Sequence, residues 1–250
     1  MEILSWPVFA LAVPAVIFAG ISKGGFGSGA AFASASILAL VLEPGAALGL
    51  MLPLLMVIDV VSLPAYWRRW SWPESRLLIY AGLPGVGLGA LFYQWTSADA
   101  IRLVIGLVCL LFIGWAWAQK SGLVRIERAM GRRAGVLAGV TLGFTSFVSH
   151  AGGPAAAVYL LGRKLDKTAF QASTVLVFWA INLSKVGIYG AMGIFSRETL
   201  LLGLALVPAA LLGTWLGIRA HRLVPERVFF GVTYVLLAVT GSKLIFDALT

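Results

Sequence analysis

GISKGGFGSG, residues 20–29, interrupts an apolar run near the start of the chain with five glycines and one lysine. Each glycine weakens a helix by about 1 kcal/mol relative to alanine, and an ammonium group at membrane depth costs roughly 3 kcal/mol or more. The stretch divides two short apolar segments, 6–20 and 27–42. A similar stretch, SFVSHAGGP at 146–154, divides segments 134–147 and 153–162. These two breaks decide how the chain folds.

The composition is typical of a membrane protein. Of the 250 residues 60% are hydrophobic and 12% are charged, whereas a soluble domain carries about 25% charge. The mean hydropathy is +0.95. We therefore predict an all-α polytopic membrane protein. Its ten apolar segments are 6–20, 27–42, 46–66, 77–95, 100–118, 134–147, 153–162, 170–190, 199–217 and 226–246. Because Glu2 stands where a signal peptide would be basic, we expect the first segment to be retained.

The net charge of +9 is concentrated in four basic loops: 66–76, 119–133, 162–168 and 219–227. Basic loops lie on the cytoplasmic side of membrane proteins, so this charge does not indicate a nucleic-acid partner. All four loops lie on one side of the membrane only if each pair of short segments enters and leaves the membrane at the same face. We therefore predict two helical hairpins in a bacterial inner-membrane, multi-pass protein with both termini periplasmic. Whether the hairpins span fully or are re-entrant stays open, and His221, in the last loop, is expected to face solvent or lipid headgroups.

A short pair followed by three long segments occurs twice. Several residues recur at a spacing of about 123, such as Asp59 with Asn182 and Tyr66 with Tyr189. The predicted divisions are a first repeat at 1–118, a cytoplasmic basic linker at 119–133 and a second, inverted repeat at 134–250. Inverted repeats with interrupted helices are an architecture of secondary transporters, with the substrate site at the repeat interface. Small-xxx-small stripes could pack within the chain or in a homodimer.

Five polar residues fall at membrane depth, Lys23 and His150 in the breaks and Asp59, Asn182 and Lys185 in long segments. Helix breaks present backbone N–H groups, and lysines supply positive charge, so we predict a site for a small anion. Alternatively, Lys23 extends to the interface and Lys185 pairs with Asp59. Asp59 and His150 are candidates for proton coupling, with Asp59 as a counter-ion the alternative. The predicted substrate-binding set is Lys23, Gly24, Gly25, His150, Gly152, Gly153, Asn182 and Lys185.

The two breaks also resemble those of the TauE/SafE sulfite exporter family. The resemblance rests on AGISKGGFGSG (19–29) and on SHAGGP, YLL, LDKT and FWAINLSK, which follow in family order within 143–195. It implies export, or occasionally uptake, of sulfite, sulfonates or related anions, coupled to protons. The matching polar positions are Lys23, Gly24, Gly25, Gly27, His150, Gly152, Gly153, Pro154, Asn182 and Lys185. Lys23 departs from the family pattern, in which a hydrophobic residue is common, so the anion stays open.

Together these features predict a secondary transporter that exports a small anion, with sulfite or an organosulfonate first, by alternating access around the two hairpins. Its partners would be the anion, protons and membrane lipid. An anion channel and an importer of small organic carboxylates or thiosulfate are the alternatives. The sequence contains no HExxH motif and no cysteine cluster, so we expect no catalytic residues, metal or cofactor.

Overall fold

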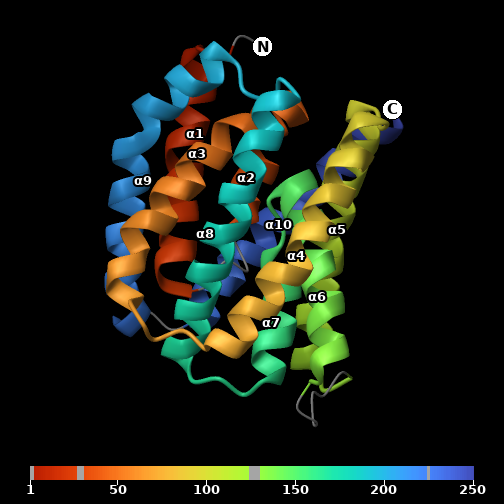
Figure 1. The fold of residues 1–250 in the computed structure, drawn as a ribbon. Coiled ribbons are helices and arrows are strands. Elements are labelled where there is room, and N and C mark those ends of the chain that lie inside the picture. The colour runs from red at the N-terminus through yellow and green to blue at the C-terminus, as the bar shows by residue number, and fades with distance from the viewer. Residues whose placement is uncertain (1–2, 27–30, 124–129, 224–225) are drawn as a thin grey trace.

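A computed structural model gives the fold and describes residues 3–26, 31–123, 130–223 and 226–250. The side chains of 222–230, 232 and 233 are outside this description. Throughout the described ranges the protein is helical and has no strand, which confirms the predicted all-α class (Figure 1). The elements are α1 Trp6–Ile21, the π-helical turn η1 Ser22–Phe26, α2 Phe32–Leu38, α3 Pro44–Ser62, the 3₁₀ turn η2 Leu63–Tyr66, α4 Trp72–Gln94, α5 Ala98–Lys120, α6 Arg132–Ser149, α7 Gly153–Gly162, α8 Lys167–Ala191, α9 Arg197–Leu223 and α10 Glu226–Leu249.

Six of the helical segments searched in the described part of the chain are long and apolar enough to cross a membrane. They are Trp6–Phe26, Pro44–Tyr66, Trp72–Gln94, Ala98–Lys120, Lys167–Ala191 and Arg197–His221. The short segment predicted at 27–42 is only partly helical, because α2 covers seven residues and 27–30 lie outside the described residues.

Helix starts follow local sequence signals. Proline opens α1, α3, α4 and α7, where its missing N–H has no helical partner to lose. Ser97 caps α5 by accepting a hydrogen bond from the backbone N–H of Ala100. Asp166 caps α8 by accepting from Thr168 and Ala169. These signals place the long helices within a few residues of the predicted segments.

The two hairpins enter the bundle from opposite ends (Figure 1). Helix α1 starts at the end that holds both termini, and α2 returns toward it, whereas α6 rises from the other end and α7 returns there. The basic loops gather at this second end. There Arg163 Nη1 donates to the Met130 carbonyl at 2.9 Å, and Lys167 Nζ donates to the His221 carbonyl at 2.8 Å.

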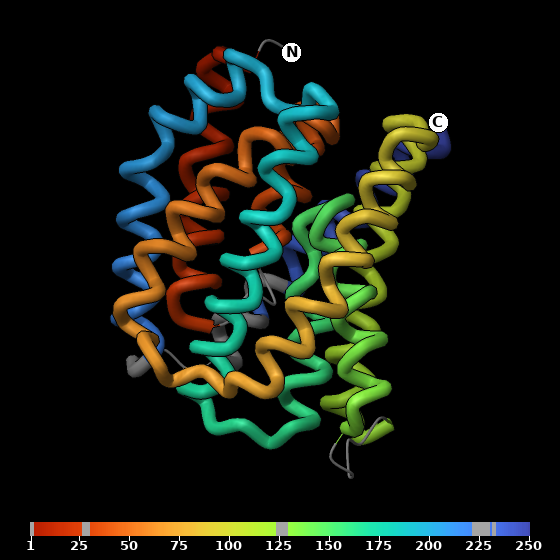
Figure 2. Tube along the Cα trace, in the orientation of Figure 1, coloured from red at the N-terminus to blue at the C-terminus, as the bar shows by residue number. Residues whose placement is uncertain are grey.

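The principal helix contacts can be compared between the two predicted repeats, 1–118 and 134–250. Most contacts of a helix in one range have an equivalent when each helix is replaced by the one at the same place in the other range. Helix α1 packs on α9, and its counterpart α6 packs on α4; α3 packs on α9, and α8 on α4. The contacts of α3 with α8 and of α5 with α10 each pair a helix with its own counterpart (Figure 2). Helices of residues 1–118 therefore pack among helices of residues 134–250, and α1 and α6 each pack against a long helix from the other range.

Glycine makes the closest of these contacts. A Cβ atom on Gly213 of α9 would lie 2.4 Å from the Ile17 carbonyl of α1, and one on Gly143 of α6 would lie 2.0 Å from the Gly82 carbonyl of α4. Backbones can approach this closely only where both surfaces are small. These glycine stripes thus pack within the chain.

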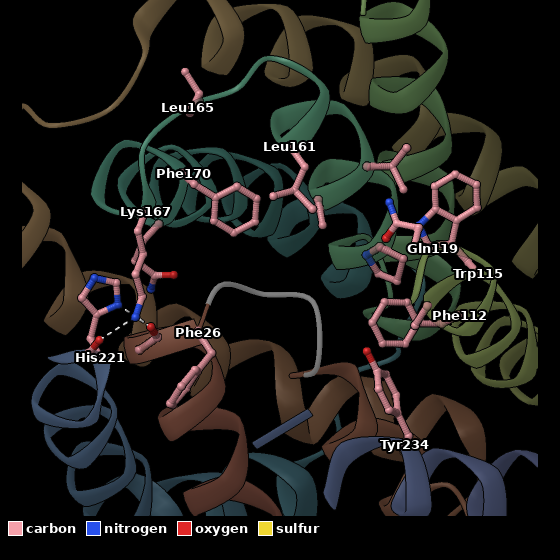
Figure 3. A pocket seen from close by; sticks show the side chains of 16 residues that line it. Phe26, Phe112, Trp115, Gln119, Leu161, Leu165, Lys167, Phe170, His221 and Tyr234 are labelled. Atoms are coloured by element: carbon pink, nitrogen blue, oxygen red, sulfur yellow. Dashed lines mark hydrogen bonds between the residues drawn. The ribbon is translucent and has the colours of Figure 1, made fainter. Parts of the chain in front are cut away.

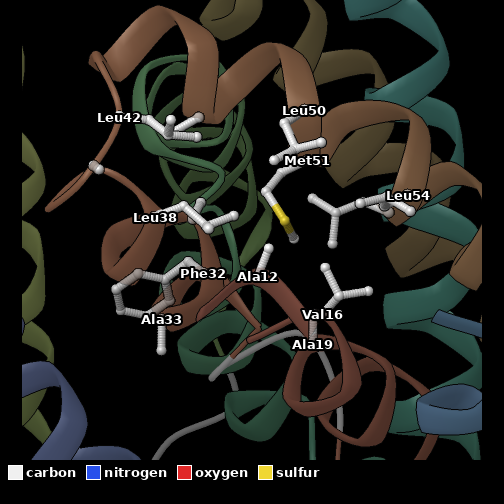
Figure 4. Packing of buried hydrophobic residues seen from close by; sticks show 14 of the residues in the cluster. Ala12, Val16, Ala19, Phe32, Ala33, Leu38, Leu42, Leu50, Met51 and Leu54 are labelled. Atoms are coloured by element: carbon white, nitrogen blue, oxygen red, sulfur yellow. The ribbon is translucent and has the colours of Figure 1, made fainter. Parts of the chain in front are cut away.

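The apolar core lies between the first hairpin and α3 (Figure 4). Ala12, Val16 and Ala19 of α1 face Leu50, Met51 and Leu54 of α3, and Leu38 of α2 fills the space beside them. All are nearly fully buried. This packing fixes the end of α1, from which the first break extends.

Candidate functional site

The first break is a π-helical turn whose carbonyl groups are held by other helices. The Lys23 carbonyl accepts from Gln171 Nε2 at 2.5 Å, and the Gly24 carbonyl accepts from the Tyr66 hydroxyl at 2.6 Å. His221 Nδ1 lies 2.6 Å from the Gly25 carbonyl and carries the proton, because a carbonyl only accepts. The last carbonyls of a helix lack intrahelical donors, so these side chains supply them.

His221, which the sequence predicted to face solvent or lipid headgroups, is half-buried and contacts the first break. It lies in the last turns of α9, which extends to Leu223 and carries this side chain onto η1. Its ring also meets the Tyr66 ring edge-on at 5.8 Å between centroids.

Lys23 forms a buried ion pair with Asp59 of α3, with 2.7 Å between Nζ and Oδ1. The other carboxylate oxygen accepts from Asn182 Nδ2 of α8 at 2.8 Å. Each of the three residues has 2% or less of its surface exposed. Lys23 therefore does not extend to the interface, and it is Lys23, not Lys185, that pairs with Asp59.

At the second break His150 ends α6 with a left-handed backbone, φ 54°. Glycine is the usual residue in such a position, and here the position directs the imidazole toward α3 and α8. Nε2 lies 3.1 Å from the Leu48 carbonyl and must carry the ring proton. Nδ1 is then an acceptor, and Lys185 Nζ lies 3.0 Å from it.

Lys185 is fully buried, and its partners are neutral. It donates to the Ser146 carbonyl at 2.9 Å and the Ser146 hydroxyl at 3.1 Å, in addition to His150. No described carboxylate forms an ion pair with it. The cluster thus holds two lysines and one carboxylate. An ammonium on Lys185 would leave one positive charge without a counter-ion.

The two breaks meet around a very small space. Its lining includes Lys23, Ser146, His150 and Asn182, and its volume is about 10 Å³. A water molecule needs at least about this volume. The site is therefore closed in this structure, and an anion the size of sulfite needs the surrounding helices to separate.

The four predicted glycines lie at the breaks, and contacts with other helices account for the small size of three of them. A Cβ on Gly24 or Gly25 would meet the α9 backbone at 2.8 or 2.3 Å, and one on Gly152 would meet the Leu142 carbonyl at 2.8 Å. Gly153 is buried at the start of α7, which has no side-chain cap on its first N–H groups. Anion binding by these N–H groups stays a prediction.

Sequence reasoning missed Gln171 as a neighbour of this cluster. It also noted that Tyr66 and Tyr189 recur at matching positions but assigned them no role. In the structure the Tyr189 hydroxyl donates to the Phe147 carbonyl at 2.6 Å, and the Tyr66 hydroxyl donates to the Gly24 carbonyl at the same distance. The matched tyrosines were visible in the repeat, but the carbonyls that they hold were not. Among the described residues no cluster of metal-ligating side chains is present.

Charged residues buried where interrupted helices meet, within a bundle of apolar spans, are the arrangement of a membrane transporter. A sequence profile described as "Sulfite exporter TauE/SafE" matches residues 12–244, and the chain belongs to this family of membrane transporters.

A curated relative supports the same class. It is described as "Probable membrane transporter protein MamO" from Magnetospirillum gryphiswaldense, and it is 24% identical over 216 residues. The match covers 70% of this chain and 34% of the relative, so the chain spans about a third of that protein's length. No solved structure matches the chain.

Proposed function

We propose that the protein is a secondary transporter that exports a small anion, sulfite or an organosulfonate, in a proton-coupled cycle of alternating access. The observation that carries this proposal is the buried cluster, in which Lys23 is balanced by Asp59 whereas Lys185 has only neutral partners. A buried cation without a counter-ion costs several kcal/mol. An anion bound beside Lys185 would remove this cost.

Proton coupling is assigned to the contact between His150 and Lys185. Their nitrogen atoms lie 3.0 Å apart, and each has a lone pair when unprotonated, so one proton can reside on either atom. An anion at this site favours protonation of both groups, because it stabilises both positive charges. Binding of the anion and uptake of a proton are then linked.

Alternating access is supported by the exchange of helix contacts and by hairpins that enter from opposite ends. We propose that these features reflect the inverted repeat, with halves 1–118 and 134–250 joined by the basic linker. The gathering of basic loops at one end supports a cytoplasmic location for that end and periplasmic termini.

The test is flux in proteoliposomes with an imposed proton gradient and a pH dye inside. Sulfite is compared with methanesulfonate, which is fully ionised near neutral pH and carries no proton of its own. We expect anion flux that responds to the gradient and proton movement that accompanies it. His150→Gly, which suits the left-handed backbone, is expected to carry less anion with no gradient dependence.

The channel alternative gives a different result. Flux driven by the anion gradient and membrane potential alone, without proton movement in the wild type, would identify a channel. Two results would identify the importer. One is anion movement only toward the side that corresponds to the cytoplasm, and the other is transport of carboxylates or thiosulfate in preference to sulfite.

A further inference from the structure

A cavity of about 410 Å³ lies on the basic side of the closed site (Figure 3). It touches both breaks, through Gly25 and Phe26 of the first and Pro154 of the second. The last turns of α5 and α9 and the first turns of α8 and α10 also contribute to its wall. The cavity is therefore a vestibule between the basic end and the cluster.

Five aromatic rings contribute to the vestibule's wall. Figure 3 shows them around the central space: Phe26, Phe112, Trp115, Phe170 and Tyr234. A hydrated oxyanion gains little from such a surface. An apolar group gains about 25 cal/mol for each Å² that leaves water. Ligand pockets of about 300–1,000 Å³ usually bind organic molecules, so the volume also exceeds what sulfite needs.

Polar groups are few and lie at defined places in the wall. Lys167, at the start of α8, supplies a positive charge at the basic end. Deeper in the wall, Gln171 is 1% exposed, and its Nε2 donates to the Lys23 carbonyl. Its Oε1 is buried and has no hydrogen-bond partner in the described part of the protein. A buried acceptor without a donor costs about 1–3 kcal/mol, so this atom indicates a ligand that supplies a donor.

The vestibule lies at a place where one predicted repeat has a helix contact that the other lacks. Helix α2 packs on α10, but the equivalent packing of α7 on α5 is absent from the principal contacts of the described helices. The space between α7 and α5 is the vestibule, to which α5 contributes Phe112 and Trp115 and α7 contributes Ala157 and Leu161. This opening gives access from the basic end while the cluster is closed.

We propose that the vestibule is a binding site for a soluble organic anion, a sulfonate or carboxylate with a bulky apolar body and a hydrogen-bond donor. The apolar body packs on the rings, the acid group lies toward Lys167, and the donor reaches Gln171 Oε1. This inference rests on the proposed anion transport and narrows its substrate class from inorganic sulfite to organic anions.

An anionic lipid has the same chemistry, a charged head on an apolar body, and the test separates the two. The protein is placed in nanodiscs of phosphatidylcholine alone or with phosphatidylglycerol. Binding of 4-hydroxybenzenesulfonate, benzenesulfonate, the neutral 4-hydroxybenzenesulfonamide and sulfite is measured by calorimetry. In parallel, sulfite flux is measured in proteoliposomes.

Two variants change the vestibule without touching the cluster, and one serves as a control. Ala157→Phe fills the cavity and Lys167→Gln removes its charge, whereas Phe246→Ala removes an aromatic ring that is 63% exposed on α10. We expect 4-hydroxybenzenesulfonate to bind more tightly than sulfite or the sulfonamide. Its Kd should rise roughly tenfold in Ala157→Phe, about fivefold in Lys167→Gln and not at all in Phe246→Ala.

The hydroxyl tests Gln171. Benzenesulfonate, which lacks the donor, should bind about fivefold more weakly than its hydroxylated analogue, and Gln171→Leu should abolish this difference. Equal binding of the two ligands would overturn the role of Gln171.

Three further outcomes would overturn the proposal. They are no binding of either arenesulfonate, equal binding in Ala157→Phe and wild type, and loss of binding when phosphatidylglycerol is present, which would identify lipid as the occupant. Sulfite flux with no arenesulfonate binding contradicts only the vestibule. Arenesulfonate binding that depends on Ala157, without flux of any anion, contradicts only the transport function.

Discussion

The two helix breaks occupy matching positions, but they differ in charge. In each, a tyrosine donates at 2.6 Å to a carbonyl 42 residues earlier, Tyr66 to Gly24 and Tyr189 to Phe147. The first break holds Lys23 against Asp59, so its charges balance. The second holds Lys185 against Ser146 and His150, so a proton on Lys185 is not balanced.

This difference separates two roles within one architecture. The hydrogen bonds that hold the backbone at each break are alike, as helix ends of the same kind require. The ionisable side chains differ, since Lys23 at the first break has a carboxylate partner, whereas Lys185 of α8, which contacts the second break, has none among the described residues. We therefore infer that the first break mainly maintains the structure of the site and that the second mainly binds the anion.

The largest effect is expected when Asp59 is changed to asparagine. Lys23 then loses its counter-ion in a buried position, which costs about 3–5 kcal/mol of stability, and transport is lost. Unfolding can be followed by the reaction of a thiol dye with Cys109, the single cysteine, which is buried.

The matched control exchanges the two residues. Asp59→Asn combined with Asn182→Asp returns one carboxylate to the cluster, since Asn182 is hydrogen-bonded to Asp59 and lines the same space as Lys23. A large part of the lost stability should return. A double variant as unstable as Asp59→Asn would show that the carboxylate's position, and not the charge balance, is decisive.

A second comparison replaces each lysine with methionine. Lys23→Met leaves the buried Asp59 carboxylate unpaired and should cost about 3–5 kcal/mol. Lys185→Met removes a buried cation that has no counter-ion, which favours the folded state. The variant also loses the hydrogen bonds to Ser146 and His150, which favours unfolding. Because the two effects oppose each other, the free energy of unfolding should change by less than about 2 kcal/mol. Dye-monitored unfolding and sulfite flux are measured on both.

Lys185→Met should nevertheless abolish anion flux, because it removes the charge proposed to bind the anion. Substantial flux in Lys185→Met would refute the assignment of binding to the second break. Equal destabilisation by the two substitutions would show that Lys185 has an undetected charge partner.

For the tyrosines, a loss of stability smaller than that of Asp59→Asn or Lys23→Met is expected. Tyr66→Phe and Tyr189→Phe each leave one buried carbonyl without its donor and should cost about 1–3 kcal/mol, nearly the same for both. The same dye assay checks this. If one substitution costs more than the other by several kcal/mol, the breaks are not held in equivalent ways.

The sequence predicted the fold well because its signals are local. Apolar length and proline at helix starts located the long helices, and glycine located the breaks. The sequence singled out Lys23, Asp59, His150, Asn182 and Lys185, since charge at membrane depth is rare, and the structure brings these five together in one buried cluster. The alternative prediction, a pair of Lys185 with Asp59, is wrong, because the packing of η1 against α3 brings Lys23 to Asp59 instead.

Other contacts required the tertiary structure. Gln171 is one of several polar residues near the start of α8, and nothing in the sequence shows that its amide reaches the Lys23 carbonyl. His221 belongs to a basic stretch, and its contact with Gly25 depends on how far α9 extends. Both are long-range contacts between a side chain and a backbone carbonyl, which no periodic pattern in the sequence records.

The bond between Asp59 and Asn182 joins equivalent positions of two halves that pack α3 against its own counterpart, α8. In a protein with identical halves, the conformations open to the two sides of the membrane would have equal free energy. A carboxylate in one half and an amide in the other removes that equality. Under the proposed alternating access, this difference would give the molecule a preferred resting conformation before any ligand or gradient acts on it.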